Sequence, residues 1–237
     1  MKKILHRSHE RGTTNTDWLH SRHSFNFANF YDPHRLHFGV LRVLNDDLVQ
    51  AGRGFDLHPH RDMEIISIPL RGSLKHVDDQ GHEDVIHAGD VQVMTAGKGI
   101  MHAEYNSSKE EEVAFLQIWI FPNKKNLTPA YAKKTFSFSD LQNDFLPLVT
   151  QDGQKNTLSI HQDATISYGK FSKDEQSVYT LTKPEHGCYL FLLSGEVEIE
   201  NDVLAPGDGI ALEGVEEIPM IFHKDSSLLV FDVSMQI

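Results

Sequence analysis

The sequence is poor in the features that mark secreted, membrane-spanning and nucleic-acid-binding proteins. Cys188 is the single cysteine, so no intrachain disulfide can form and the fold must rest on its core. No apolar run approaches the ~20 residues that a membrane-spanning helix needs. Lys and Arg number 22 against 34 Asp and Glu. The resulting net charge of -12 argues against direct nucleic-acid binding, which depends largely on basic side chains.

The beginning of the chain also has little that would direct it out of the cell. Residues 1–7 (MKKILHR) are basic, but no apolar segment follows them, which argues against a secretory signal. With the lone cysteine, this predicts a cytoplasmic protein without a membrane partner. The 237 residues, 39% of them hydrophobic, are enough for one large globular domain or two modest ones.

Helical periodicity is scarce, whereas short apolar or alternating runs recur between turns that contain glycine. The clearest runs are residues 64–70 (EIISIPL), 91–94 (VQVM) and 113–121 (VAFLQIWIF). Many short strands with such punctuation predict an all-β sandwich or barrel. Residues 123–144 have weaker strand signals, and we interpret them as a crossing between domains, with a short helix as one option.

One β-unit occurs twice along the chain. Gly72 is followed 17 residues later by Gly89-Asp90, and Gly195 is followed 12 residues later by Gly207-Asp208. Each copy combines a strand, a tight glycine turn, a second strand and a Gly-Asp turn that opens another strand. The repeat predicts a duplicated barrel, with domains at residues 1–135 and 136–237.

Two short patterns contain candidate metal ligands. The chain has 15 histidines, and His58-Pro59-His60 and His102-Ala103-Glu104 each place two ligand side chains two residues apart. Alternate residues of a strand share a face, so both pairs can point into one barrel. Three nitrogens and one oxygen suit a divalent first-row transition metal. Glu64 remains an alternative to Glu104, because it shares a face with the histidines if the strand is unbroken.

These patterns resemble the two cupin motifs. The longer segments that contain them resemble the sequence of a bacterial pirin. Gly52, His58, His60, Glu64 and Gly72 match the first motif, although Gly72 comes one residue late. The second motif has two extra residues before its histidine. The specific segments are residues 23–33 (HSFNFANFYDP), 58–64 (HPHRDME) and 89–102 (GDVQVMTAGKGIMH). The resemblance runs from about residue 18 to residue 131 and implies two tandem cupin (jelly-roll) barrels.

The resemblance implies that the first barrel is metal-binding, with His58, His60, His102 and Glu104 as ligands. Glu64 is then a supporting residue. It also implies one divalent ion, which we expect to be Fe(II), with Ni, Cu, Mn, Co and Zn as alternatives. The second barrel is expected to be metal-free. Counting offsets from Gly195 and Gly207 places Leu181, Lys183 and Met220 where the ligands would stand. We interpret His161, His186 and His223 as ordinary histidines.

Bacterial pirins are associated with quercetin 2,3-dioxygenase activity, so the resemblance implies a flavonol-like substrate and dioxygen. The flavonol's 3-hydroxyl would dock on the metal, and Glu104 would take its proton as the catalytic base. Ring opening by dioxygen would release carbon monoxide. Five apolar residues are candidates for pocket walls, although we expect most of them to be plain barrel core: Met63, Met94, Ile100, Met101 and Phe115.

Two other functions are compatible with the sequence. Eukaryotic pirins resemble transcription cofactors, so the chain could be a redox-sensing regulatory protein that acts through a protein partner. The net charge of -12 favours a protein over DNA in that case. The third interpretation is a sugar isomerase or another cupin activity. The close resemblance of the motif sequences to pirins argues against it.

Overall fold

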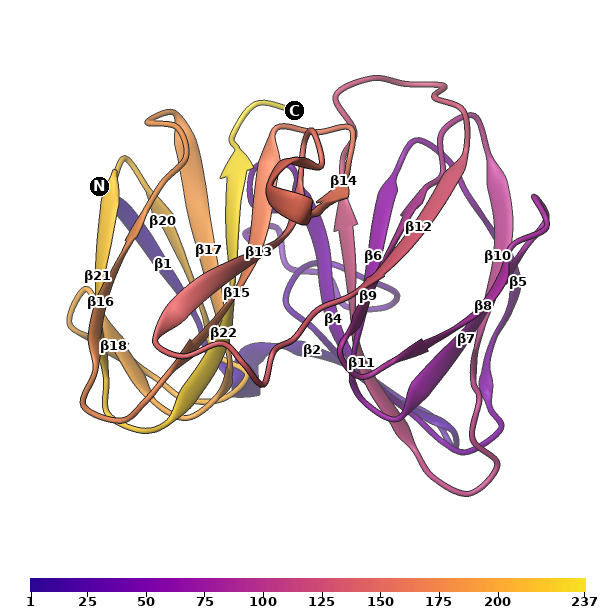
Figure 1. Ribbon diagram of the computed structural model, residues 1–237, viewed down its shortest axis with the longest axis horizontal. Coiled ribbons are helices and arrows are strands. Elements are labelled where there is room, and N and C mark those ends of the chain that lie inside the picture. The colour runs from indigo at the N-terminus through magenta and orange to yellow at the C-terminus, as the bar shows by residue number, and fades with distance from the viewer.

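The computed structural model describes the backbone of residues 1–237 and every side chain except that of Lys155. It consists of β-strands in two barrels that lie side by side (Figure 1). Along the described chain the helices are two 3-10 turns, η1 (Ser8–Glu10) and η2 (Gln154–Asn156). Neither described helix is long or apolar enough to cross a membrane. The predicted all-β fold is confirmed.

The first barrel pairs a seven-stranded sheet with a four-stranded sheet, both antiparallel. The larger sheet has the order β12 (Ala130–Thr135), β9 (Asp90–Thr95), β6 (Glu64–Arg71), β11 (Val113–Ile120), β4 (Leu41–Val49), β3 (Leu19–His23) and β2 (Gly12–Asn15). The smaller sheet has the order β5 (Gly54–His60), β10 (Ile100–Asn106), β7 (Ser73–Asp78) and β8 (Glu83–His87).

The second barrel has the same construction, except at one edge of its larger sheet. That sheet has the order β1 (Lys2–His6), β20 (Gly209–Glu213), β17 (His186–Ser194), β22 (Ser226–Ser234), β15 (Ala164–Phe171), β13 (Asp144–Thr150) and β14 (Leu158–Ser159). The edge strand β14 pairs parallel to β13. Its smaller sheet has the order β16 (Gln176–Thr180), β21 (Glu217–Phe222), β18 (Val197–Ile199) and β19 (Asp202–Leu204). Strands β4 to β11 therefore recur, in the same spatial order, as β15 to β22.

The repeated turns have the backbone that their glycines suggest. Gly72 separates β6 from β7 with φ +77°, and Gly195 separates β17 from β18 with φ +89°. The left-handed region at these positive φ values favours glycine, which has no Cβ to clash. The Gly-Asp turns open β9 and β20 as counterparts. The predicted duplication is confirmed at the level of individual strands.

An apolar seam joins the two barrels, because the larger sheets face each other. In β11, Leu116, Ile118 and Ile120 point into this seam, whereas Phe115 and Gln117 point into the first barrel. Side chains alternate between the faces of a strand, so a sheet buried on both faces needs a nearly continuous apolar run. The run at residues 113–121 is explained in this way. From the second barrel, Ile166, Leu229 and Phe231 are among the seam residues.

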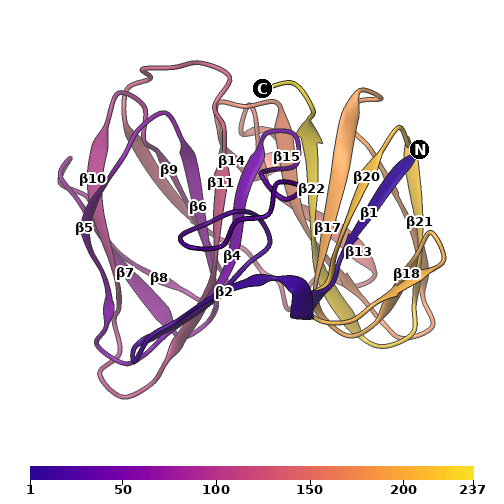
Figure 2. The same cartoon turned by 180° about the vertical axis from the view of Figure 1, so that it is seen from behind.

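The first strand of the chain belongs to the second barrel. β1 pairs with β20 from Lys2↔Glu213 to His6↔Gly209, and the following segment crosses to β2 of the first barrel (Figure 2). β12 occupies the equivalent edge of the first barrel, next to β9. The division of the chain into domains at residue 135 stays a proposal. Residues 2–6 do not follow it, because they pair with the second barrel. The short helix considered for residues 123–144 is wrong, because residues 130–135 are strand β12.

Candidate metal centre

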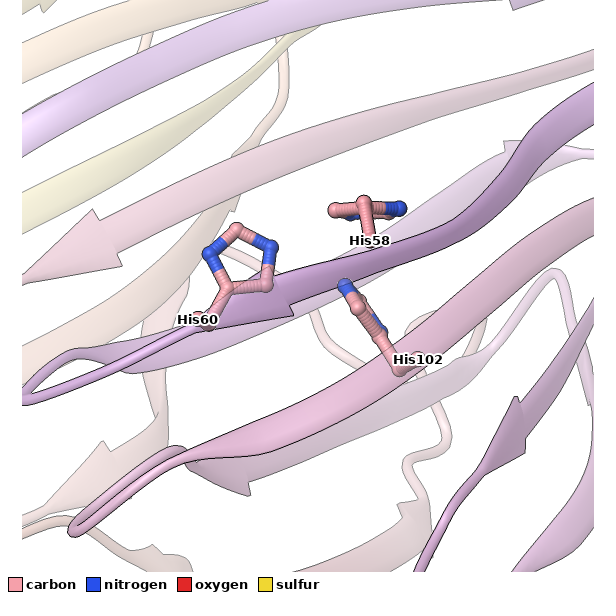
Figure 3. A group of neighbouring side chains, drawn as sticks. All are labelled: His58, His60 and His102. Carbon is pink, nitrogen blue, oxygen red and sulfur yellow. The ribbon is translucent and has the colours of Figure 1, made fainter.

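Three of the four predicted ligands come together inside the first barrel. β5 and β10 are antiparallel neighbours, and His102 lies opposite His58. His60 is two residues further along β5 and shares the face of His58. The ligand nitrogens of His58, His60 and His102 all lie within 4.8 Å of one another. Figure 3 shows the three rings on these two strands, turned toward a common space.

His60 and His102 are available as neutral ligands. His102 is fully buried, and neither of its ring nitrogens has a hydrogen-bond partner among the described residues. Burial lowers the pKa of both His60 and His102 to about 3, with help from the neighbouring histidines. His58 Nδ1 donates to the carbonyl oxygen of Asp56 at 2.7 Å, which leaves its Nε2 free. Unpartnered buried nitrogens are costly without a ligand, so this cluster fits a metal ion.

The fourth predicted ligand, Glu104, lies two residues beyond His102 on β10. One Glu104 carboxylate oxygen lies within 4.8 Å of a ring nitrogen of His102 and of His76. It does not form such a group with all three predicted histidines. Ser67 Oγ donates to one carboxylate oxygen at 3.0 Å, and Gln117 Nε2 donates to the other at 2.6 Å. Burial raises the pKa of Glu104. The carboxylate is therefore held beside His102 in a poorly solvated position.

His76 is a site residue that the sequence reasoning missed. It lies on β7 directly opposite Glu104 and is fully buried. Its Nε2 contacts the Asp78 carboxylate at 3.2 Å, and Gln92 Nε2 lies 3.5 Å from its Nδ1. His76 and Asp78 have the same two-residue spacing as the predicted pairs and lie between Gly72 and Gly89. That spacing was the signal that could have identified them.

Glu64, the alternative carboxylate, faces away from the histidines. β5 ends at His60, and the chain turns through Asp62 (φ +49°) before β6 begins in the other sheet. On β6, Glu64 shares a face with Ile66 and points into the seam. There it accepts hydrogen bonds from Thr95 Oγ1 at 2.7 Å and from His161 Nδ1 of the second barrel at 3.2 Å.

A row of polar side chains crosses the inner face of the larger sheet beneath the site. The strand register places five residues side by side across β3, β4, β11, β6 and β9, namely His23, Asn45, Gln117, Ser67 and Gln92. Gln117 and Ser67 bond Glu104, Gln92 contacts His76, and His23 Nδ1 contacts Asn45 at 2.9 Å. Buried polar groups need such partners. The row thus orients the side chains that face it.

A cavity of about 220 Å³ adjoins the cluster. His58, His60 and Glu104 lie in its wall, together with the aromatic side chains of Phe27, Phe55 and Trp119. Polar residues from the larger sheet complete the lining, among them Ser21, His23, Asn45, Asp47 and Gln117.

None of the five candidate wall residues lines the cavity, in agreement with the expectation that most of them are barrel core. Met94 and Ile100 belong to a separate apolar cluster against which Met63 packs, and Phe115 belongs to another cluster with Leu74. Met101 does not line the cavity either. Phe27 and Trp119 do line it, and they lie in segments that the sequence analysis had already singled out, residues 23–33 and 113–121.

The interior of the second barrel is apolar at the corresponding place. The counterparts of β5 and β10 are β16 and β21, whose inward side chains include Tyr179, Ile218, Met220 and Phe222. Met220 lies on the strand that the offset predicted. Leu181 and Lys183 lie beyond the end of β16, because the loops of the two copies differ in length. That this barrel binds no metal stays a prediction.

The three histidines predicted to be ordinary in the second half of the chain each contact a carboxylate. His161 bonds Glu64, and His223 Nε2 lies 3.1 Å from Glu198. His186 is buried, and its Nδ1 lies 2.6 Å from Asp232. All three have carboxylate partners, as structural histidines commonly do.

Comparison with known proteins places the chain among close relatives. The family model described as Pirin matches residues 5–120, and that described as Quercetinase C-terminal cupin domain matches residues 147–233. A protein of Escherichia coli named quercetin 2,3-dioxygenase is 38% identical over 229 residues, which cover 97% of each chain. A putative quercetin 2,3-dioxygenase of Pasteurella multocida is 37% identical and covers 95% of this chain and 97% of its own.

Solved structures agree with these matches. The crystal structure of YhhW from Escherichia coli superposes with a TM-score of 0.93 at 38% identity, covering 98% of this chain and 97% of that one. A second structure, of bacterial pirin YhhW in complex with nickel(II), also has a TM-score of 0.93, at 37% identity, and covers 98% and 99% of the two chains.

Proposed function

Because the chain belongs to the pirin family, we propose that it is a metal-dependent dioxygenase that cleaves flavonols such as quercetin. The observation that carries the proposal is a group of three convergent imidazoles, two of which, His58 and His60, lie in the wall of a cavity with aromatic sides. Such a site can hold a metal ion and a flat aromatic ligand next to each other. The relatives named quercetin 2,3-dioxygenase support the choice of substrate.

In this proposal His58, His60, His102 and Glu104 hold one divalent transition ion. The donor set of three imidazoles and one carboxylate suits iron, nickel, copper, manganese, cobalt or zinc. Fe(II) is our first expectation for the native ion, and the nickel(II) complex of the Escherichia coli relative makes nickel the obvious second. When bound, the ion would act as a Lewis acid on a chelating hydroxyl and give dioxygen a place to react.

Glu104 is the proposed general base. Its pKa is raised by burial, which brings a carboxylate closer to the range in which it can take a proton at neutral pH. Ser67 and Gln117 hold both carboxylate oxygens and so fix the direction in which Glu104 can accept the 3-hydroxyl proton of a flavonol. Gln117 and Glu104 both line the cavity, so a proton donor in the cavity can approach them.

Phe27, Phe55 and Trp119 are the proposed walls for the substrate rings. Trp119 also packs edge-on against His60, with ring centroids 4.9 Å apart, so one aromatic wall touches a proposed ligand. The cavity volume of about 220 Å³ is below the ~300–1,000 Å³ typical of pockets for drug-sized ligands. We therefore expect it to enclose part of a flavonol, including the chelating oxygens, and to leave the remainder at its mouth.

Oxygen uptake and carbon monoxide release on quercetin test the proposal. The metal-stripped protein is reloaded separately with iron, copper, nickel, manganese and cobalt, and each form is assayed. Activity should need a metal, vanish on chelation and return on reloading. Methylation of the 3-hydroxyl of quercetin should abolish it, because a chelating oxygen is lost. If no metal supports turnover, the dioxygenase proposal fails and the regulatory alternative becomes the working hypothesis.

A further inference from the structure

The cavity has a second polar feature that neither the metal ligands nor the general base uses. Asp47 lies on β4 in the larger sheet, whereas His58 and His60 lie on β5 in the smaller sheet that faces it. All three line the same cavity. Asp47 is 4% exposed, and its Oδ1 has no hydrogen-bond partner among the described residues. A buried carboxyl oxygen without a partner is unfavourable, which points to a partner that enters the cavity.

The neighbours of Asp47 are occupied with one another. His23 bonds Asn45 through Nδ1 at 2.9 Å and Thr14 through Nε2 at 2.9 Å. Ser21 Oγ lies 3.3 Å from His23 Nδ1. The Asp47 carboxyl, which has Ser21 beside it, thus keeps an open position at Oδ1. Burial raises its pKa to about 7, so near neutral pH the carboxyl can donate as well as accept a hydrogen bond.

We propose that Asp47 is a specificity-determining residue that binds a phenolic hydroxyl of the substrate, distant from the oxygens that chelate the metal. The assignment rests on the proposed function and deepens it. A ligand held at one end by the smaller sheet would be fixed in orientation by a second polar anchor on the larger sheet. The site would then select polyhydroxylated flavonols over a flavonol that carries only the chelating hydroxyl.

The experiment compares two ligands against matched variants. Quercetin has further phenolic hydroxyls, whereas 3-hydroxyflavone has only the chelating one. Dissociation constants are measured for both by tryptophan fluorescence quenching on the full-length, nickel(II)-loaded protein without oxygen, so that turnover does not interfere. The variants are Asp47→Ala, the isosteric Asp47→Asn and the control Asp46→Asn. Asp46 is the next residue on β4, and its partly exposed carboxylate faces Arg11 rather than the cavity.

Asp47→Ala should weaken quercetin binding by about 10-fold to 100-fold, the usual range for one lost hydrogen bond in a buried site. Binding of 3-hydroxyflavone should change by less than about 2-fold, because it makes no such bond. Asp47→Asn keeps the shape of the side chain and one acceptor oxygen. Its dissociation constant for quercetin should lie between those of the wild type and Asp47→Ala, and its dissociation constant for 3-hydroxyflavone should not change. Asp46→Asn should bind both ligands as the wild type does.

Equal losses for the two ligands, or no loss for quercetin, would overturn the assignment. If Asp47→Ala does not fold, the same comparison is made with Asp47→Asn, and an unchanged preference for quercetin again overturns it. Failure of the wild type to bind either flavonol would overturn both proposals. The expected binding pattern without oxygen uptake or carbon monoxide release would contradict the dioxygenase function and leave the role of Asp47 standing.

Discussion

The two barrels share a strand order but enclose opposite interiors. The first encloses His58, His60, His76, His102 and Glu104, with a row of polar side chains beneath them. At the equivalent place the second encloses an apolar cluster that includes Leu190, Leu212, Ile218, Met220 and Phe222. The backbone is thus compatible with either content. What separates a metal centre from a packed core is the identity of the inward-facing side chains at a few positions on two strands.

The difference also has an energetic side. Buried polar groups give little net stability even when they are paired, whereas buried apolar side chains stabilise in proportion to the area removed from water. The seam and the second barrel hold the larger apolar clusters, and the two clusters inside the first barrel are small. We infer that the seam and the second barrel supply most of the apolar burial, while the first barrel contains the candidate metal site.

The largest expected effect separates the two barrels by metal content. His102→Ala should lower the bound metal, measured by elemental analysis, from one ion per chain to nearly none, and His58→Ala should do the same. The control is His223→Ala in the second barrel, where the histidine contacts Glu198; it should retain the wild-type content. A full ion per chain in His102→Ala would contradict the ligand assignment. An ion bound in the second barrel would contradict the prediction that only the first barrel binds a metal.

The second effect compares the two buried glutamates. Glu104→Gln should weaken metal binding and lower turnover by about 100-fold or more, because the general base is lost. Glu64→Gln should lose less of both, because that side chain contacts Thr95 and His161 in the seam. Oxygen uptake and metal content are measured on both variants. The opposite order would make Glu64 the functional carboxylate.

The third effect tests where stability resides. Leu190→Ala removes a fully buried side chain of β17 in the second barrel. It should lower the free energy of unfolding by about 2–5 kcal/mol and the melting temperature by about 5–15 °C. Metal content per folded chain should not change. Leu57→Ala, at a side chain of β5 that is 56% exposed, is the control and should shift stability by less than about 0.5 kcal/mol. Loss of metal in Leu190→Ala would mean that the barrels are not separable in this way.

The smallest effect is a pH dependence of the metal-free protein that arises in the first barrel. The unfolded chain binds a proton at His60 and His102 near pH 6.5, whereas the folded chain binds it near pH 3. The unfolded state therefore holds more protons between these values, and stability falls as the pH is lowered from about 6.5 toward 3. His102→Gln should reduce the loss between pH 7 and pH 4 by about 2 kcal/mol, measured by urea unfolding. An unchanged pH profile would contradict the buried, neutral state of His102.

Much of the first barrel follows from local patterns. The runs at residues 64–70, 91–94 and 113–121 became β6, β9 and β11, because β-branched and aromatic residues suit a sheet. The two-residue spacing of His58 and His60 placed both on one face of β5. The glycine turns predicted the duplication, since positive φ at Gly72 and Gly195 leaves few other residues suitable. These inferences needed only neighbours in the chain.

Other features depend on partners that are distant in the chain. Nothing near residues 2–6 indicates that this strand pairs with residues 209–213. Strand alternation could not predict the direction of the Glu64 side chain. The turn at Asp62 moves the chain to the other sheet, so Glu64 no longer shares a face with His58 and His60. In β11 both faces are buried, so the run itself does not say that Trp119 lines the cavity while Ile118 enters the seam.

The residue types alone determined that the chain is a duplicated all-β protein with a histidine group suited to a metal. Tertiary structure decided which carboxylate lies beside His102, which walls enclose the cavity and which barrel receives the first strand. The physical reason is that turn geometry and side-chain alternation act over a few residues. Register between strands that are distant in the chain is set by how two sheets bury both of their faces together, and His76 and Asp47 reach the site through that register.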